Sequence, residues 1–223
     1  MLDQPVFIFA ASWRTGSTLL QRMFNSTGEL LMHGEPQILW ALEKSFDQAR
    51  KVCSTNADQW RVFEKTGPAR AWTPNLNPEV QNSEAGFKAL FDTAYGQPSR
   101  NLGYKRWGFK EVRNGAFKNY QFMRMLYPES KTIFLVRDPI DTFISVRNTD
   151  FYSQFPGPYA PLRVWCQNTI SFLKAQHENA EGSLLVGLED LLLNPDKLIS
   201  DICQYCDIKR QEGMHTALRH VVG

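Results

Sequence analysis

The chain lacks the features that mark several large classes of protein. Its four cysteines in 223 residues are too few for the disulfide framework of a small secreted domain. Its formal net charge of +2 gives no excess of basic charge that would indicate a nucleic-acid partner. The longest apolar runs, such as TIFLV and SLLVGL, are far too short to span a bilayer. We therefore expect no nucleic-acid partner and no transmembrane segment.

We also expect no leader of a secreted protein at the beginning of the chain. Residues 5–10 already have the apolar pattern of a strand, and Asp3 interrupts any basic segment before them. We therefore expect a cytoplasmic protein. A hydrophobic fraction of 43% is enough for a continuous core, so we expect residues 1–223 to form a single domain.

Two of the cysteines form the sequence CQYC, which has the spacing of a pair of metal ligands. Cys203 and Cys206 have no second pair after them, and His215 and His220 are the histidines that follow. The segment has a helical pattern, in which a spacing of three places both thiols on one face. We interpret the pair as part of a buried helix face, with a zinc or redox site as the alternative.

Three apolar, β-rich runs are each followed by a helical pattern. They are residues 6–12, 131–137 and 183–188. Their hydrophobicity is continuous rather than alternating, which is typical of strands buried on both faces of a parallel sheet. Residues 102–111, with glycines and several aromatics, are expected to form a fourth strand. This order predicts an α/β fold of the P-loop-like, three-layer α/β/α type, with a central, mainly parallel sheet and ligands at the carboxyl ends of its strands.

The ends of two predicted helices have clear signals. Asp138 followed by Pro139 is typical of an N-cap and a first helical residue. The pair Asn194-Pro195 indicates a break within or before the last long helix. Proline-rich stretches at 66–84 and 151–161 predict irregular connections. The predicted helices cover residues 17–26, about 36–50, about 78–95, 114–126, 139–148, about 160–180 and 190–206.

The loop ASWRTGSTLL follows the first strand directly. A nucleotide-binding P-loop reads G-x-x-x-x-G-K-[ST], where backbone amides hold phosphates, the lysine reaches them and the hydroxyl binds magnesium. Gly16 and Thr18 keep their places in this window, but Ala11 replaces the first glycine and Ser17 the lysine. The positive charge lies at Arg14 instead. The helix that begins near Ser17 still directs free N–H groups at an anion, so the loop predicts an anion site that differs from a kinase site.

A second predicted strand ends in a similar way, within KTIFLVRDPIDTFISVRN. Arg137 lies at the carboxyl end of the strand, and Ser145 follows eight residues later on the next helix. A guanidinium and a hydroxyl so placed can hold one phosphate. Each segment alone has a plainer structural alternative. The first can be an ordinary strand–turn–helix junction, and Arg137 can pair with Asp138 or Asp141 while Ser145 lies on the helix surface.

Together the two segments resemble sulfotransferases that use 3′-phosphoadenosine 5′-phosphosulfate (PAPS). Those enzymes have a 5′-phosphosulfate loop of the form [RK]-[ST]-G-[ST]-[ST] and a 3′-phosphate element of the form R-[DN]-P-x-D-x-x-x-S. The resemblance implies a donor with two separated anionic groups. The matching residues are Arg14-Thr15-Gly16-Ser17-Thr18 and Arg137-Asp138-Pro139-Ile140-Asp141-…-Ser145.

Further segments extend the resemblance over about residues 5–208, although 45–100 contains no matching motif. LMHGEPQILWAL is similar to the region that supplies the catalytic base in tyrosylprotein-type and related bacterial sulfotransferases, and this implies Glu35 as the base. RWGFKEVRNG resembles their W-G-x-K-T-P segment, which implies that Lys110 faces the transferred sulfuryl group. Glu111-Val112 departs from the usual Thr-Pro. LLVGLEDLLLNPDKLISDICQYCDI is similar to their last core strand and the helix that follows.

The resemblance implies sulfuryl transfer from PAPS to a hydroxyl or amine acceptor by in-line displacement, with no metal required. Glu35 would take the acceptor proton, while Arg14 and Lys110 would stabilise charge on the leaving phosphate and on the sulfuryl oxygens. Backbone and hydroxyl groups of residues 15–18 would bind the 5′-phosphosulfate, and Arg137 with Ser145 the 3′-phosphate.

Each role has an alternative. His33 can be the base instead, Glu35 can cap a helix at Pro36, and Lys110 can pair with Glu111 or another acid. Arg106 and Arg113 can add to the anionic pocket or be solvated. The rival functions are a P-loop kinase or NTPase and a catalytically silent protein that binds PAPS or its product.

The acceptor is expected to be a small molecule, a carbohydrate or a lipid-like chain. Its pocket would come from segments 36–100 and 150–165, whose aromatic side chains suit a ring, an apolar chain or a protein core. Trp13 can line the same pocket or pack at the end of its strand. The aromatic residues of the two segments are Trp40, Phe46, Trp60, Phe63, Trp72, Phe151, Tyr152, Phe155 and Tyr159.

Overall fold

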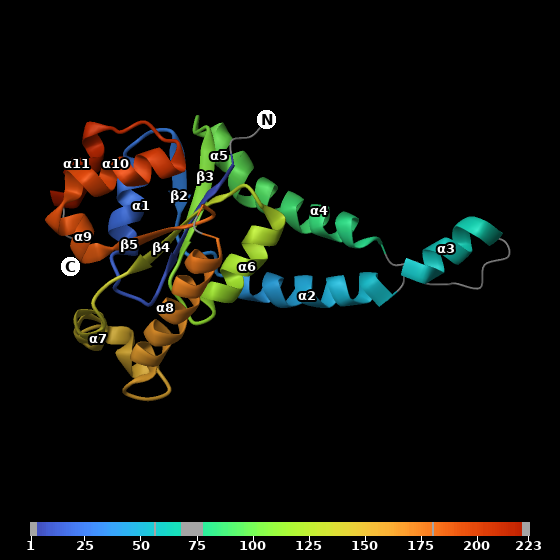
Figure 1. Ribbon diagram of the computed structural model, residues 1–223, viewed down its shortest axis with the longest axis horizontal. Coiled ribbons are helices and arrows are strands. Elements are labelled where there is room, and N and C mark those ends of the chain that lie inside the picture. The colour runs from blue at the N-terminus through green and yellow to red at the C-terminus, as the bar shows by residue number, and fades with distance from the viewer. Residues whose placement is uncertain (1–3, 56, 68–77, 180, 220–223) are drawn as a thin grey trace.

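The strands form one parallel sheet in the order β2-β3-β1-β4-β5 (Figure 1). The computed structural model describes residues 4–55, 57–67, 78–179 and 181–219. β1 is the central strand, so its carboxyl end lies between those of β3 and β4. The two predicted anion-binding segments begin at the ends of β1 and β4, which are neighbours. The P-loop-like α/β/α fold predicted from the sequence is confirmed. The strands are β1 (Val6–Ala10), β2 (Leu30–His33), β3 (Arg106–Glu111), β4 (Lys131–Val136) and β5 (Leu184–Gly187).

Helices cover both faces of this sheet (Figure 1). Alternate residues of β1 point to opposite faces, so Ile8 belongs to one core and Phe7 and Phe9 to the other. All five residues of β1 are completely buried, as expected for a central parallel strand. The Ile8 face is covered by α1 (Ser17–Asn25), α9 (Leu188–Leu193), α10 (Pro195–Cys206) and α11 (Glu212–Arg219). The Phe7 face is covered by α2 (Leu39–Thr55), α4 (Val80–Phe91), α6 (Ala116–Leu126) and α8 (Ala160–Glu178).

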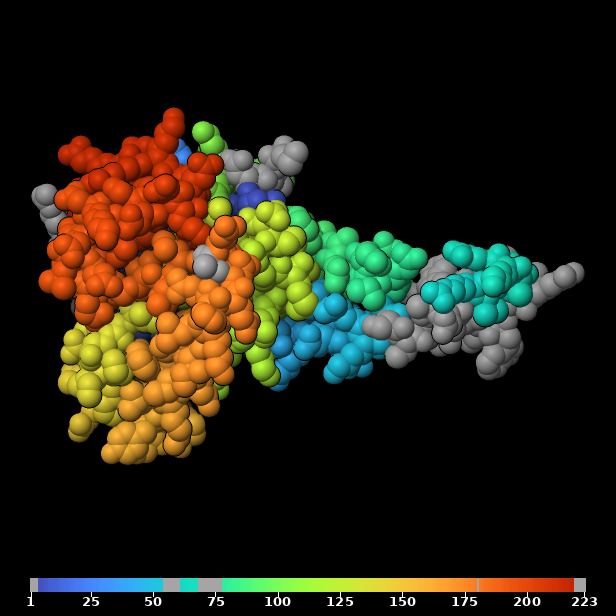
Figure 2. Space-filling view, in the orientation of Figure 1, coloured from blue at the N-terminus to red at the C-terminus, as the bar shows by residue number. Residues whose placement is uncertain are grey.

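The segment 45–100, which matched no motif, is helical. Helices α2 and α4 extend side by side away from the sheet, with α3 (Ala57–Thr66) beyond them, and Figure 2 shows that they stand out from the body of the molecule. Near the body, Phe46 is buried against Phe87 and Phe122, with ring centroids 5.2 and 4.9 Å apart. The chain returns to β3 through the π-helix η1 (Asp92–Gly96) and α5 (Gln97–Asn101).

Several predicted boundaries differ from the structure. The strand β2 and the helices α3, α5 and α11 were not predicted. The strand expected at 102–111 begins at Arg106. The helix expected from 36 begins at Leu39. The break predicted at Asn194-Pro195 is confirmed, because it separates α9 from α10. Of the connection expected at 66–84, residues 68–77 lie outside the described residues.

The CQYC pair lies on α10, as the buried-helix interpretation requires. Cys206 is completely buried and Cys203 nearly so, with its Sγ 3.6 Å from Sδ of Met214. Burial raises the pKa of the Cys206 thiol to about 12. Across the described ranges, no group of three or more His, Cys, Asp or Glu side chains is placed to hold a metal ion. None of the described helices has the length and apolar character needed to cross a membrane.

Candidate active site

A cavity of about 370 Å³ opens at the carboxyl ends of β1, β3 and β4. Its apolar wall includes Leu188 and Leu192 of α9 and Leu218 of α11. Its polar wall brings together side chains from four separate parts of the sequence. These polar residues, all of them predicted from the sequence, are Arg14, Ser17, Thr18, Glu35, Lys110 and Arg137.

The loop after β1 has the backbone of an anion-binding turn. Arg14 and Gly16 both have positive φ angles, 65° and 89°, and α1 begins at the next residue, Ser17. The N–H groups of Ser17 and Thr18 therefore have no partner within the helix. The Thr15 side chain is not in the cavity, because it is buried and its hydroxyl donates to the Ser12 carbonyl at 2.9 Å. The loop thus offers backbone N–H groups and the positive end of a helix to the cavity.

We expect a G16A substitution to destabilise the protein and to abolish anion binding by the loop. An alanine would have to keep a φ near 89°, and its Cβ would lie 2.6 Å from Cδ1 of Leu188. A strained φ of this kind costs roughly 1–3 kcal/mol before the collision is counted. Urea unfolding of the variant measures the loss.

G115A is the matched control. Gly115 precedes α6 with φ 86° and ψ 11°, close to the 89° and 11° of Gly16, but no atom lies within 4 Å of a Cβ there. Backbone strain should therefore be similar in the two variants. If G16A loses no more stability than G115A, the contact with Leu188 does not constrain the loop.

The second predicted anion element contacts the first directly. Arg137 Nη1 donates to the Arg14 carbonyl at 3.0 Å, and Arg14 Nε donates to Ser145 Oγ at 3.1 Å. Ser145 lies on α7 (Pro139–Arg147), whose predicted N-cap is present: the Asp138 carboxylate accepts from the N–H groups of Ile140 and Asp141 at 2.8 and 3.0 Å. The structure therefore joins two segments that are 123 residues apart into one cationic surface.

Glu35 and Lys110 meet across the same cavity. Lys110 Nζ donates to Glu35 Oε1 at 2.7 Å, and the two side chains are 9% and 26% exposed, respectively. The acidic partner of Lys110 is thus Glu35 and not its neighbour Glu111. Since α2 begins at Leu39, Glu35 does not take the position of a helix cap at Pro36. A carboxylate and an ammonium group lie together at the mouth of the anion site.

His33, the alternative base, is placed elsewhere. Its Nε2 lies 3.0 Å from Ser99 Oγ, and its ring packs edge-on against Tyr95, with centroids 5.2 Å apart. Burial lowers the pKa of His33, which favours the neutral ring. It is not one of the residues that line the cavity. The structure therefore brings Glu35, rather than His33, to the cavity wall.

The two arginines considered for the anionic pocket both have other partners. Arg106 Nε donates to the Gln4 carbonyl at 2.8 Å, at the opposite end of the sheet. Arg113 forms two hydrogen bonds with the Glu111 carboxylate, Nε to Oε1 at 2.8 Å and Nη2 to Oε2 at 2.7 Å. Neither arginine lines the cavity, and Arg106 is buried while Arg113 is partly exposed. The Glu111–Arg113 pair was not found from the sequence.

The aromatic residues expected around an acceptor lie in three environments: the cavity, the core and the surface. Phe151, on the 3₁₀ helix η2 (Asp150–Gln154), lines the cavity together with Trp13. Trp13 also packs edge-on against Phe155, with ring centroids 5.0 Å apart, so it both lines the cavity and makes a packing contact. Phe46 is a core residue, and Trp40 and Tyr159 are exposed. Trp72 lies outside the described residues, as does the side chain of Trp60.

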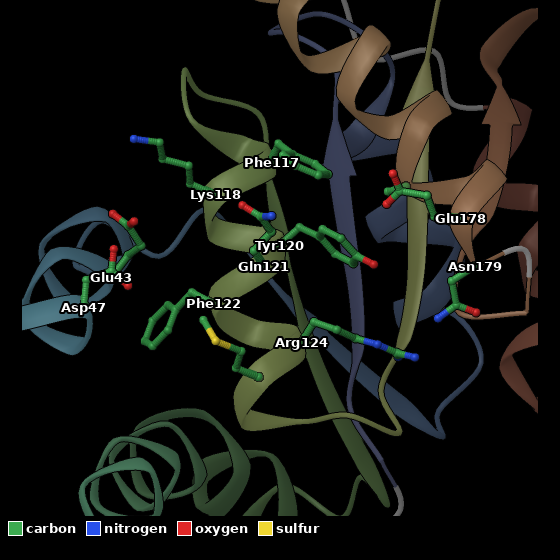
Figure 3. A pocket seen from close by; sticks show the side chains of 12 residues that line it. Glu43, Asp47, Phe117, Lys118, Tyr120, Gln121, Phe122, Arg124, Glu178 and Asn179 are labelled. Carbon is green, nitrogen blue, oxygen red and sulfur yellow. The ribbon is translucent and has the colours of Figure 1, made fainter. Parts of the chain in front are cut away.

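A second cavity, of about 550 Å³, lies beside α6 and contains none of the predicted site residues. Figure 3 shows Glu43 and Asp47 of α2 on one side of α6 and Glu178 of α8 on the other. Lys118 and Arg124 lie among these acids, so the lining has no dominant charge. This cavity lacks the converging cations and helix N-terminus of the first.

Comparisons with known proteins are consistent with this geometry. A model described as the sulfotransferase family matches residues 5–212. The sulfotransferase domain from the curacin biosynthetic pathway matches with a TM-score of 0.62 and 20% identity, covering 100% of this chain and 79% of that one.

Two other solved structures are also similar in fold. The sulfotransferase domain of the Synechococcus PCC 7002 olefin synthase matches with a TM-score of 0.60 and 19% identity, covering 99% and 78%. Mouse sulfotransferase SULT7A1, solved in complex with PAP, matches with a TM-score of 0.52 and 13% identity, covering 98% and 64%. No curated protein sequence matches the chain.

Proposed function

The chain belongs to the sulfotransferase family, and from this we propose that it transfers the sulfuryl group of PAPS to a hydroxyl or amine of an acceptor. The observation that carries the proposal is one cavity in which Arg14, Arg137 and the start of α1 converge beside the Glu35–Lys110 pair. A mouse protein of the same fold is complexed with PAP, the desulfated product of PAPS.

The residues of the cavity suit such a donor. Two arginines and a helix N-terminus form a surface for two anionic groups. Residues 15–18 would hold the 5′-phosphosulfate by backbone N–H groups and by the Ser17 and Thr18 hydroxyls. Arg137 and Ser145 would hold the 3′-phosphate. When bound, PAPS supplies an activated sulfuryl group on a phosphate that leaves readily.

Glu35 would act as the general base. It accepts the proton of the acceptor hydroxyl while the acceptor oxygen bonds to sulfur and the bond from sulfur to the donor's bridging oxygen breaks. Lys110, now paired with Glu35, would move its ammonium group toward the sulfuryl oxygens, where negative charge must be stabilised. Arg14 would stabilise the phosphate that leaves. Holding the reactants in line is the larger part of this chemistry.

The acceptor would enter beside Trp13 and Phe151. These aromatic side chains line the same cavity as Val112 and Glu35. Flat apolar surfaces of this kind suit the ring of a sugar or phenol, or an apolar chain. We therefore keep small molecules, carbohydrates and lipid-like chains as the acceptor classes.

Thermal unfolding with added PAP tests the proposal. We expect PAP to stabilise the protein without magnesium, by about 2.7 kcal/mol at a concentration 100 times its Kd. ATP with magnesium should have a much smaller effect. Stabilisation by ATP–magnesium alone would contradict a sulfotransferase and favour a P-loop kinase. Transfer of radiolabelled sulfate from PAPS to a panel of acceptors then separates an enzyme from a silent binding protein.

A further inference from the structure

The loop that carries Glu35 depends on the neighbouring strand for its position. It runs from the end of β2 at His33 to the start of α2 at Leu39 and has no helix or strand of its own. In the parallel register of β2 and β3, His33 lies beside Phe109. Residues 35–37 therefore continue alongside residues 111–113, where β3 ends.

Arg113 joins these two segments. Its Nη2 donates to the Pro36 carbonyl at 2.9 Å, and its Nη1 donates to Gln37 Oε1 at 2.9 Å. The same guanidinium also donates to both carboxylate oxygens of Glu111, from Nε to Oε1 at 2.8 Å and from Nη2 to Oε2 at 2.7 Å. A planar guanidinium that is bound to a carboxylate by two parallel hydrogen bonds has a fixed orientation. Arg113 therefore fixes the residue that follows Glu35.

The Glu111 side chain is itself held in place, so it gives Arg113 a fixed position. Its side chain is completely buried, and its Oε1 also accepts from the backbone N–H groups of Val112 and Arg113 at 2.9 and 3.0 Å. Lys110 and Glu111 are adjacent on β3, so their side chains point to opposite faces of the sheet. The Lys110 side chain lines the cavity, whereas Glu111 binds Arg113, which in turn contacts the Pro36 carbonyl.

Glu35 needs a second contact to hold its position, because its ion pair with Lys110 would have to break during the reaction. Lys110 holds Glu35 now, but its role toward the sulfuryl oxygens would draw it away from that carboxylate. We propose that Arg113, held by Glu111, is a positioning residue that keeps Glu35 directed into the cavity when Lys110 leaves it. This inference rests on the proposed function.

The R113M variant removes the guanidinium and keeps the apolar part of the side chain. We expect kcat for sulfuryl transfer to fall roughly 10- to 100-fold, because a small displacement of a catalytic group has an effect of that size. R113M leaves the buried Glu111 carboxylate without its guanidinium, so the free energy of unfolding should fall. PAP binding should stay at the wild-type level below the unfolding transition, which shows that the fold is intact in the assay. R124M is the control, since Arg124 donates to the Ser130 carbonyl at 2.8 Å, outside the cavity, and it should keep the wild-type kcat.

A double-variant cycle separates a positioning role from a general structural one. If Arg113 acts through Glu35, R113M should reduce kcat by no more than about twofold when E35Q is already present. Effects that multiply in the double variant would overturn the proposal. So would a wild-type kcat in R113M.

Hydrogen exchange gives a readout that needs no acceptor. In R113M the backbone amides of residues 34, 35 and 37–39 should exchange faster than in the wild type and in R124M. Unchanged exchange there would overturn the role of Arg113, whatever the activity. A wild-type protein that transfers no sulfuryl group to any acceptor or to water would contradict the proposed function instead, and the exchange result would still decide the role of Arg113.

Discussion

E35Q should lower kcat by about 10²- to 10⁴-fold with an alcohol acceptor, the usual range for loss of a general base. The amide has nearly the same shape as the carboxylate but cannot accept the acceptor proton. The Lys110 ammonium, whose side chain is 9% exposed, then has a neutral amide as its partner, so we also expect some loss in the free energy of unfolding. PAP binding should persist, because the 5′- and 3′-phosphate sites are formed by other residues. Steady-state kinetics with radiolabelled donor measure the effect.

Two further experiments, the H33Q variant and an ionised acceptor, test whether Glu35 rather than His33 is the base. His33 lies against Ser99 and Tyr95, so H33Q should keep most of the activity. A phenol that is already ionised at the pH of the assay needs no base, and E35Q should transfer to it at nearly the wild-type rate. Loss of activity in H33Q with full activity in E35Q would give the role of base to the histidine. Equal losses by E35Q with ionised and neutral acceptors would remove Glu35 from that role.

The parts of the fold that the sequence predicted are those with a strong local signal. The apolar runs of β1, β4 and β5 and the cap at Asp138 are visible in short windows. Of these strands, β5 lies at the edge of the sheet and only its Val186 is buried, so the expected burial on both faces is wrong there. The strand β2 has four residues and one neighbouring strand, so it is too short to show a period. The expected strand at 102–111 began too early, because Leu102 is 69% exposed and Gly103 has a φ of 87° in a turn.

The site, too, has parts that the sequence could predict and parts that it could not. Residues that directly follow a strand, such as Arg14 and Arg137, could be placed at one edge of the sheet by topology alone. The Glu35–Lys110 contact depends on the register of β2 with β3, in which His33 pairs with Phe109. The contact of Arg113 with Pro36 depends on the same register and on a buried carboxylate two residues earlier. Glu-x-Arg after a strand is the signal that could have indicated it, but the same letters are common on solvated surfaces.

K110M should lower kcat by about 10²- to 10³-fold, the effect expected when one group that stabilises transition-state charge is removed. Unlike the loss in E35Q, this loss should appear with every acceptor, because the sulfuryl oxygens must be stabilised whether or not the acceptor is ionised. The partner left behind, Glu35, is 26% exposed and can be solvated, so the loss in the free energy of unfolding should be limited. The KM for PAPS should change much less than kcat, since Arg14 and Arg137 remain.

The ionised phenol therefore separates the two members of the pair. With that acceptor, E35Q should be active and K110M slow, whereas with an alcohol both should be slow. K118M is a suitable control, because Lys118 is an exposed lysine of α6 that borders the other cavity. A K110M variant that recovers with the ionised acceptor would show that Lys110 acts only by holding Glu35. In that case the structure seen here, with the two side chains 2.7 Å apart, would already be the one in which transfer occurs.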